Sequence, residues 1–161
     1  MSSEAPNPYE EQGISIINHS RYMVVATSDK EGRPWAAPVF YTFNSNYDFY
    51  FLSAIDSRHA KNIIENQNVA LVIYDSNSPI GISQGVQIEG TAIPLQGKEL
   101  EKAISLYSSR LFKNSHLTPS ERYRPEDYGV GSEFRFFKVT VTSAYTNGAD
   151  RRVNIRLNGK G

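Results

Sequence analysis

The chain has 161 residues, of which 39% are hydrophobic, 12% aromatic and 21% charged, values that suit one folded domain and exclude a disordered or fibrous chain. Seventeen basic residues balance seventeen acidic residues, so no overall field draws the protein to nucleic acid or to an anionic membrane. Because the sequence contains no cysteine, disulfides, thiolate metal sites and thiol nucleophiles are excluded.

Neither a signal peptide nor a membrane span is expected. Met1-Ser2-Ser3-Glu4 lacks the basic and apolar regions of a signal peptide, and the apolar runs of the chain are too short to span a membrane. We therefore expect a cytoplasmic protein. Residues 1–8 are predicted to form a mobile arm, residues 9–157 a single domain and residues 158–161 a tail.

The predicted elements begin with a helix followed by two strands. Apolar residues at helical spacing predict the helix over 9–18, and a β-branched run predicts a strand over 22–27 that ends in a polar turn at Gly32. The second strand, 35–43, contains Pro38. Since proline cannot donate to a sheet ladder, we expect it at an edge, at a bulge or where a ligand meets the backbone.

Next, aromatic and β-prone residues predict a third strand over 48–53, and apolar residues on one face predict a helix over 58–65. Asp56 or Ser57 would cap this helix. Four aromatic residues of the second and third strands and their connection are candidates for stacking on a planar cofactor, although such residues are more often core: Trp35, Tyr47, Phe49 and Tyr50.

The second half of the chain is predicted to contain further strands, a long amphipathic helix and a long polar connection. The strands are expected over 69–74, 86–93, 134–142 and 153–157, the helix over 98–111 and the connection over 112–132. The length of the connection suggests a lid, a binding loop or an interface segment. Six or seven strands, mostly in hairpin order, predict a mainly β protein with an antiparallel barrel and outer helices.

The junction between the third strand and the second helix is the densest polar segment of the sequence. The first backbone N–H groups of a helix have no internal partner and the helix dipole is positive there, while Ser57, Arg58 and Lys61 add a hydroxyl and two cations. This pattern suits a phosphate monoester, and the alternative is a solvated first turn. The three histidines, His19, His59 and His116, show no metal-ligand spacing, so no metal site is predicted.

At this point the sequence resembles the FMN-binding split-barrel proteins of the pyridoxamine 5'-phosphate oxidase type. The resemblance runs from about Ile16 to Phe137. Its elements are Met23 to Ser28, Ala36-Ala37-Pro38-Val39-Phe40-Tyr41, Phe49-Tyr50-Phe51-Leu52-Ser53, Asp56-Ser57-Arg58-His59, Asn66-Gln67-Asn68-Val69-Ala70-Leu71 and Gly85-Val86-Gln87-Ile88-Glu89-Gly90.

The resemblance implies a split β-barrel that binds FMN. In the family the phosphate is held after the third strand and the flavin ring lies against the second strand. Further contacts come from the end of the third strand and from the strand that follows the fourth. The implied cofactor-binding residues are Pro38, Val39, Phe40, Leu52, Ser53, Ser57, Arg58, His59, Lys61, Gln84 and Gln87.

The sequence departs from the oxidase's own substrate-binding pattern. Cations of the family are missing at Ala37, at Tyr41 or Thr42, and at Gln84 and Gln87. In the family's substrate-phosphate helix a tyrosine lies four residues before an arginine, whereas in this chain Tyr107 lies three residues before Arg110. The terminal signature of the oxidase is also absent. We therefore expect pyridoxamine 5'-phosphate to be a poor substrate.

The resemblance implies an FMN-dependent oxidoreductase with a small-molecule substrate, with reduced nicotinamide as one candidate electron donor. Catalytic side chains are not identified, because hydride transfer to a flavin requires stacking and orientation more than a protein acid. The alternatives are a non-catalytic flavin-binding or sensor protein, and a barrel that holds a deazaflavin or haem. Members of the family pair around a two-fold axis, so a homodimer is expected.

Overall fold

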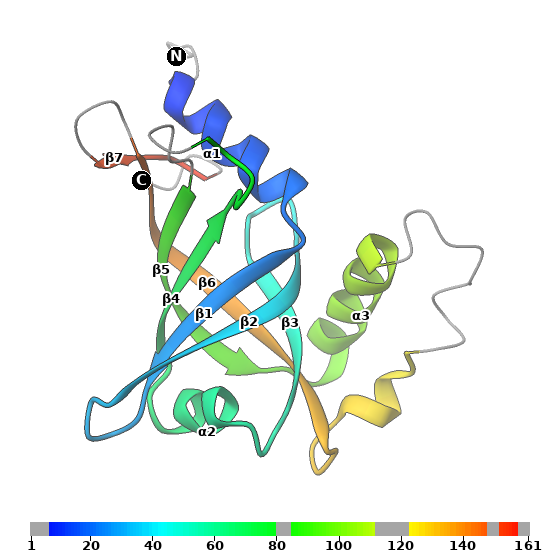
Figure 1. The fold of residues 1–161 in the computed structure, drawn as a ribbon. Helices are drawn as coiled ribbons and strands as arrows, with labels where there is room; N and C mark the ends of the chain where they lie inside the picture. The colour runs from blue at the N-terminus through cyan, green and yellow to red at the C-terminus, as the bar shows by residue number, and fades with distance from the viewer. Residues whose placement is uncertain (1–6, 80–84, 112–122, 148–151, 158–161) are drawn as a thin grey trace, which may run out of the picture.

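The computed structural model describes residues 7–79, 85–111, 123–147 and 152–157. Its strands form one antiparallel sheet in the order β3-β2-β1-β4-β5-β6-β7, and β3 also pairs with β6. The first six strands therefore close into a barrel, and β7 adds a seventh strand to β6 (Figure 1). The strands are β1 (Tyr22–Ser28), β2 (Pro34–Phe43), β3 (Phe49–Ala54), β4 (Asn68–Tyr74), β5 (Gly85–Pro94), β6 (Phe134–Asn147) and β7 (Arg152–Asn154).

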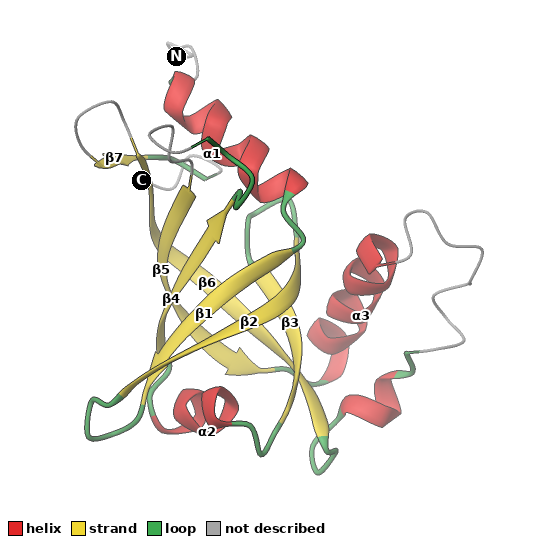
Figure 2. Ribbon diagram, in the orientation of Figure 1, coloured by secondary structure: helices red, strands yellow, loops and turns green. Residues whose placement is uncertain are grey.

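Within the described ranges, three α-helices and a short 3-10 helix pack against this barrel (Figure 2). They are α1 (Pro8–His19), α2 (Arg58–Glu65), α3 (Gly97–Leu111) and η2 (Pro125–Tyr128). The predicted class, a mainly β antiparallel barrel with outer helices, is confirmed. Helix α1 begins at Pro8, inside the range expected to form an arm, because Asn7 caps it by accepting from the backbone N–H of Tyr9 at 3.0 Å.

The main core fills the barrel. Alternate residues of each strand point inward, as in the pattern of Met23, Val25 and Thr27 on β1. Phe51 and Phe137 are fully buried and stack with ring centroids 5.2 Å apart. A second cluster lies outside the barrel, where α3 and η2 cover aromatic and aliphatic side chains of β2, β3 and β6.

Helix α2 closes the end of the barrel opposite α1 (Figure 1). Its inner face carries Ala60 and Ile63, both fully buried, and Asn62, which donates from its buried amide to the Thr27 hydroxyl at 3.0 Å. A second bond runs from the Asn66 amide to the Ser28 hydroxyl at 3.0 Å. Two side-chain amides and an apolar face therefore fix α2 on the end of β1.

The element boundaries differ most from the prediction in the last third of the chain. β6 runs on to Asn147, five residues past the predicted end, because it pairs with β3, β5 and β7 in turn. β7 ends at Asn154, after which Ile155 and Leu157 are buried in the main core. Of the predicted connection 112–132, residues 112–122 lie outside the described residues, and Tyr123 and Tyr128 pack against the α3 cluster.

Candidate functional site

The barrel is split between β2 and β3. These strands pair only through Tyr41↔Phe51, Thr42↔Tyr50 and Phe43↔Phe49. Beyond that point the earlier part of β2 follows β1 alone, whereas β3 continues along β6. Among the described strands, residues 34–40 of β2 therefore have a strand on one side only. Pro38 lies in this segment, paired with Val24 of β1. Of the three places expected for it, an edge, a bulge or a ligand contact, the structure shows the sheet edge.

Three polar side chains converge where β3 ends and α2 begins. The Ser53 hydroxyl lies 2.5 Å from Nε2 of His59, and the Ser57 hydroxyl lies 3.3 Å from both Nε2 and Ser53 Oγ. Ser57 is the N-cap of α2 and accepts from the Ala60 backbone N–H at 3.3 Å. The local sequence builds this cluster, because the cap that starts the helix also brings Ser57 and His59 back towards the end of the strand.

His59 gives the cluster a variable charge. The ring is half-buried, and burial lowers its pKa below the ordinary value of a histidine. Without a bound ligand the ring is therefore neutral at neutral pH. Its Nε2 then lies within hydrogen-bonding distance of the Ser53 and Ser57 hydroxyls. A bound phosphate would favour the imidazolium and raise the pKa, because an adjacent anion stabilises the charged form.

The two cations of the first turn lie beside this cluster. The Arg58 guanidinium carbon lies 4.5 Å from the ring centroid of Trp35, an exposed residue of β2. Arg58 and Lys61 line a shallow hollow of about 390 Å³ together with Arg33, which is paired with Asp29 at 2.7 Å and with Glu31 at 3.0 Å. The hollow therefore contains one arginine already paired with two carboxylates, the two cations at the start of α2, and a further lysine and glutamate, Lys30 and Glu65.

The remaining predicted residues divide into those near the split and those far from it. Pro38 is exposed, whereas the Val39 side chain faces the core and offers only its backbone. Phe40 and Leu52 are half-buried under α3. Gln87 lies on β5, three strands from β2, where it accepts from Arg152 at 3.2 Å. Within a single copy of the chain, Gln87 therefore does not lie at the split. Gln84 lies outside the described residues.

Of the aromatic candidates, only Trp35 remains available to a ligand at the split. Phe49 and Tyr50 are buried in the two cores, and Tyr47 stacks on Phe43 with centroids 5.5 Å apart. No sequence pattern indicates that Arg58 lies over the ring of Trp35, because the two residues are 23 positions apart and meet only where α2 closes the end of the barrel. An aromatic residue three positions before the unusual Pro38 was the only available signal.

The profile of the family described as pyridoxamine 5'-phosphate oxidase matches residues 10–148. The chain belongs to this family. The UPF0306 protein YhbP of Escherichia coli is 30% identical over 91 residues, which are 56% of this chain and 62% of the relative. The chain thus matches about three fifths of that relative's length. The resemblance inferred from the sequence motifs is confirmed.

Two solved structures share the fold at low sequence identity. The haem-binding protein of Mycobacterium smegmatis superposes with a TM-score of 0.74 and 20% identity, over 98% of this chain and 61% of that one. HutZ, the haem storage protein of Vibrio cholerae, superposes with a TM-score of 0.61 and 15% identity, over 80% of this chain and 86% of that one.

The described residues contain no cluster of three or more His, Asp or Glu side chains arranged to hold a metal ion. No helix among them is long and apolar enough to cross a membrane.

Proposed function

We propose that the protein binds FMN at the split between β2 and β3 and acts as an oxidoreductase on a small molecule. The observation that carries this proposal is the convergence of Ser53, Ser57 and His59 at the start of α2, beside the free side of β2. When bound, FMN would supply the electron transfer. The protein's own residues would hold the phosphate, orient the ring and leave one ring face open to the substrate.

The residues present fit the phosphate end of this cofactor. Two hydroxyls and an imidazole converge within 3.3 Å of one another. They lie at the N-terminus of α2, where the first backbone N–H groups and the positive end of the helix dipole favour an anion. Arg58 adds a planar fork suited to phosphate oxygens. At the ring end, the backbone of residues 34–40 offers peptide groups that none of the described strands uses on that side.

Arg58→Ala is expected to weaken FMN binding by about tenfold to a hundredfold, because one charge-assisted hydrogen bond to phosphate is lost. Riboflavin lacks the phosphate, so its affinity should be nearly the same for both proteins. The measurement is a fluorescence titration with each ligand. Arg33→Ala is the matched control, since this neighbouring arginine is already paired with Asp29 and Glu31. Unchanged FMN affinity in Arg58→Ala would contradict the proposed clamp.

Haem is a second candidate cofactor, and His19 is the observation in its favour. Nδ1 of His19 lies 2.8 Å from the Ser15 carbonyl oxygen. A neutral ring that donates from Nδ1 keeps its lone pair on Nε2, which is the arrangement common in metal-bound histidines. The two structural relatives named for haem agree with this reading. The absorbance spectrum of the purified protein, with a flavin double band or a haem Soret band, decides between the two cofactors.

A non-catalytic flavin-binding or sensor protein is distinguished from an enzyme by turnover. We expect the FMN-loaded protein to oxidise a reduced nicotinamide in the presence of an electron acceptor. Slow, stoichiometric reduction without turnover would favour a binding or sensor role. A deazaflavin would be recognised by its single absorption band.

Pyridoxamine 5'-phosphate is expected to be a poor substrate. Arg110 of α3 is the counterpart of the arginine in the family's substrate-phosphate helix. It donates to the carbonyl oxygens of Ile17 at 3.2 Å and Ser20 at 2.5 Å. Tyr107 is buried at 8% exposure. Neither side chain can therefore reach a substrate phosphate without leaving its place in the fold. Formation of pyridoxal 5'-phosphate is the measurement, and turnover at rates ordinary for an enzyme on its own substrate, about 1 to 1,000 per second, would contradict the expectation.

We also propose a homodimer that pairs through the outer face of β2, β1 and β4. Small apolar side chains cross these strands in two registered rows: Pro38, Val24 and Val72, and Ala36, Ala26 and Ala70. All six are exposed or half-buried. An exposed apolar face of this kind is suited to a second copy of the chain.

Sedimentation across a dilution series tests the dimer, and FMN is expected to shift dissociation to lower protein concentration if the cofactor contacts both chains. Ala70→Glu places a charge in the middle of the face and should produce monomers. Thr140→Glu, at an exposed position of β6, is the matched control and should leave the assembly unchanged. A stable monomer that binds FMN at full affinity would contradict both the interface and a shared site.

A further inference from the structure

One arginine at the α2 end of the barrel is buried without a counter-ion. Arg135 of β6 is 8% exposed, and its side chain donates one hydrogen bond, from Nη2 to the Leu95 carbonyl oxygen at 2.8 Å. Its Nε has no hydrogen-bond partner, and no carboxylate among the described residues forms an ion pair with the guanidinium. A guanidinium carries five N–H donors, so most of the hydrogen-bonding capacity of this cation is unused.

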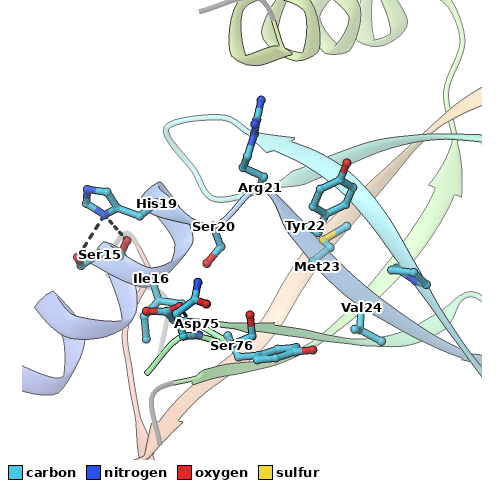
Figure 3. A pocket seen from close by; sticks show the side chains of 13 residues that line it. Ser15, Ile16, His19, Ser20, Arg21, Tyr22, Met23, Val24, Asp75 and Ser76 are labelled. Atoms are coloured by element: carbon cyan, nitrogen blue, oxygen red, sulfur yellow. Dashed lines mark hydrogen bonds between the residues drawn. The ribbon is translucent and has the colours of Figure 1, made fainter. Parts of the chain in front are cut away.

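A buried cation in this state is costly for the fold. Charged side chains are rarely buried unless they are paired, because removal from water disfavours the charged form. Arg110, which is half-buried, has two carbonyl acceptors and two aromatic rings around its guanidinium. At the α1 end of the barrel, Nδ1 of His19 lies 2.8 Å from the Ser15 carbonyl oxygen (Figure 3). Arg135 differs from these groups, and its unpaired charge points to an anion that comes from outside the described chain.

The sheet register places Arg135 beside the polar cluster of the candidate site. Phe51 pairs with Phe137, and Ser53 pairs with Arg135. Directly paired residues of antiparallel strands share one face of the sheet, so Ser53 and Arg135 are the next inward-facing pair after the stacked rings of Phe51 and Phe137. The ring of His59 also lies near Phe51, with centroids 6.3 Å apart. Ser53, His59 and Arg135 therefore follow the same aromatic pair at the α2 end of the barrel.

Two different elements supply the polar groups of this layer. Ser57 and His59 belong to the start of α2, whereas Arg135 belongs to β6, the strand that pairs with the end of β3. The Cβ atoms of paired residues lie about 4.5–5.5 Å apart, so the Arg135 side chain begins within reach of a group bound at the Ser53 hydroxyl. Backbone hydrogen bonds hold β6 on both sides here, from Ile55 to residue 133 and from Leu95 to residue 136, each at 2.8 Å.

The donors of this layer suit a phosphate group better than a carboxylate. Two hydroxyls, an imidazole and two guanidinium groups are available, from Ser53, Ser57, His59, Arg58 and Arg135. A phosphate monoester has three terminal oxygens and carries about 1.5 to 2 negative charges at pH 7, whereas a carboxylate has two oxygens and one charge. The monoester therefore matches both the number of donors and the two arginine charges.

We propose that Arg135 is a phosphate-binding residue, and that the anion it lacks is the phosphate group of a monoester held between β6 and the start of α2. That this monoester is FMN rests on the proposed function. The binding of a phosphate group does not, because it follows from the unpaired guanidinium and from the donors that share its layer.

Arg135→Met removes the charge and keeps an unbranched side chain. FMN binding is expected to weaken about tenfold to a hundredfold, because a charge-assisted hydrogen bond to phosphate is lost, whereas riboflavin should bind both proteins equally. Arg135→Lys should lose less affinity for FMN, since it keeps the charge but not the planar fork. Flavin fluorescence follows both titrations. Arg124→Met is the matched control: this exposed arginine is paired with Glu126 and Asp127, and its removal should change neither affinity.

The ratio of FMN affinity to riboflavin affinity separates a binding role from a structural one. If Arg135 served only to hold Leu95 in place, Arg135→Met would lower the stability or weaken both ligands alike. The ratio would then stay at the value of the unaltered protein. An unchanged ratio in the folded variant would overturn the proposal.

A measurement on the unaltered protein covers the case in which Arg135→Met does not fold. Inorganic phosphate is titrated into the FMN-free protein at constant ionic strength, with chloride as the balancing ion, and the arginine Nε–H resonances are followed by NMR. The Arg135 resonance is identified by its absence from Arg135→Lys. We expect this resonance to shift with phosphate and not with chloride. If it stays in place, the proposal is wrong, even where the backbone N–H resonances of residues 57–60 move.

The outcomes also separate this inference from the FMN proposal. If phosphate shifts the Arg135 resonance and FMN does not bind, the phosphate site is supported and the cofactor proposal is wrong. If FMN binds and is weakened by Arg58→Ala but not by Arg135→Met, the cofactor proposal stands and the present inference is wrong.

Discussion

Arg110→Ala is expected to lower the free energy of unfolding by about 3 kcal/mol, because its guanidinium makes two hydrogen bonds and two ring contacts in a half-buried position. It donates to the carbonyl oxygens of Ile17 and Ser20. The guanidinium carbon of Arg110 lies 4.6 Å from the ring centroid of Tyr41 and 5.0 Å from that of Phe43. The side chain thus ties α3 to the end of α1 and to β2, and its loss leaves the Ser20 carbonyl without this donor.

Denaturant unfolding measures this change, and the fitted slope shows whether the folded state itself has altered. Arg124→Ala is the matched control. Arg124 pairs with Glu126 and Asp127 at an exposed position, so its removal should cost less than about 1 kcal/mol. The loss of unfolding free energy in Arg110→Lys should lie between those of Arg110→Ala and Arg124→Ala, because an ammonium group keeps the charge but not the planar fork. A loss below about 1 kcal/mol in Arg110→Ala would show that the contacts contribute little.

Gly90→Ala is expected to destabilise the barrel by about 2 to 3 kcal/mol through overpacking. A Cβ at this position would lie 2.5 Å from the backbone oxygen of Thr140 and 3.0 Å from Cγ1 of Val139. The register between β5 and β6 shifts at this point, where Glu89 pairs with Ser143 and Gly90 with Val141. Moving the two backbones apart would cost stability, because β5 and β6 are both paired within the closed barrel.

The same denaturant titration measures Gly90→Ala, and Gly129→Ala supplies its control. Gly129 has an ordinary φ of −76°, and an added Cβ there meets no atom within 4 Å. Alanine at position 129 should be neutral or stabilising by a few tenths of a kcal/mol, since it restricts the unfolded chain. Equal stability of the two variants would contradict the argument from close approach at Gly90.

Much of the fold could be predicted because local sequence signals agree with the tertiary structure. The helix over 58–65 was predicted with its observed bounds, since Ser57 caps it and its apolar residues repeat at helical spacing. The end of β6 could not be predicted in the same way. Ser143, the first residue beyond the predicted end, resembles a loop residue, and it is held in the strand by Glu89, 54 positions away.

The part of the candidate site formed by residues close together in the sequence was predictable. The part that depends on the order of strands in the barrel was not. Ser53, Ser57 and His59 lie within seven residues, so a strand followed by a capped helix is enough to bring them together. Gln87 lies three strands from β2, a separation set by the order of strands in the sheet.

The two sides of α2 separate the sealing of the barrel from the recognition of a ligand. Positions 60, 62 and 63 fill the barrel end or bond to β1, and the exposed positions 58 and 61 belong to the candidate site. Side chains at the exposed positions can therefore be exchanged without opening the barrel. A family built on this helix can change the charge and shape of its ligand site through a few substitutions while the unfolding free energy stays nearly constant.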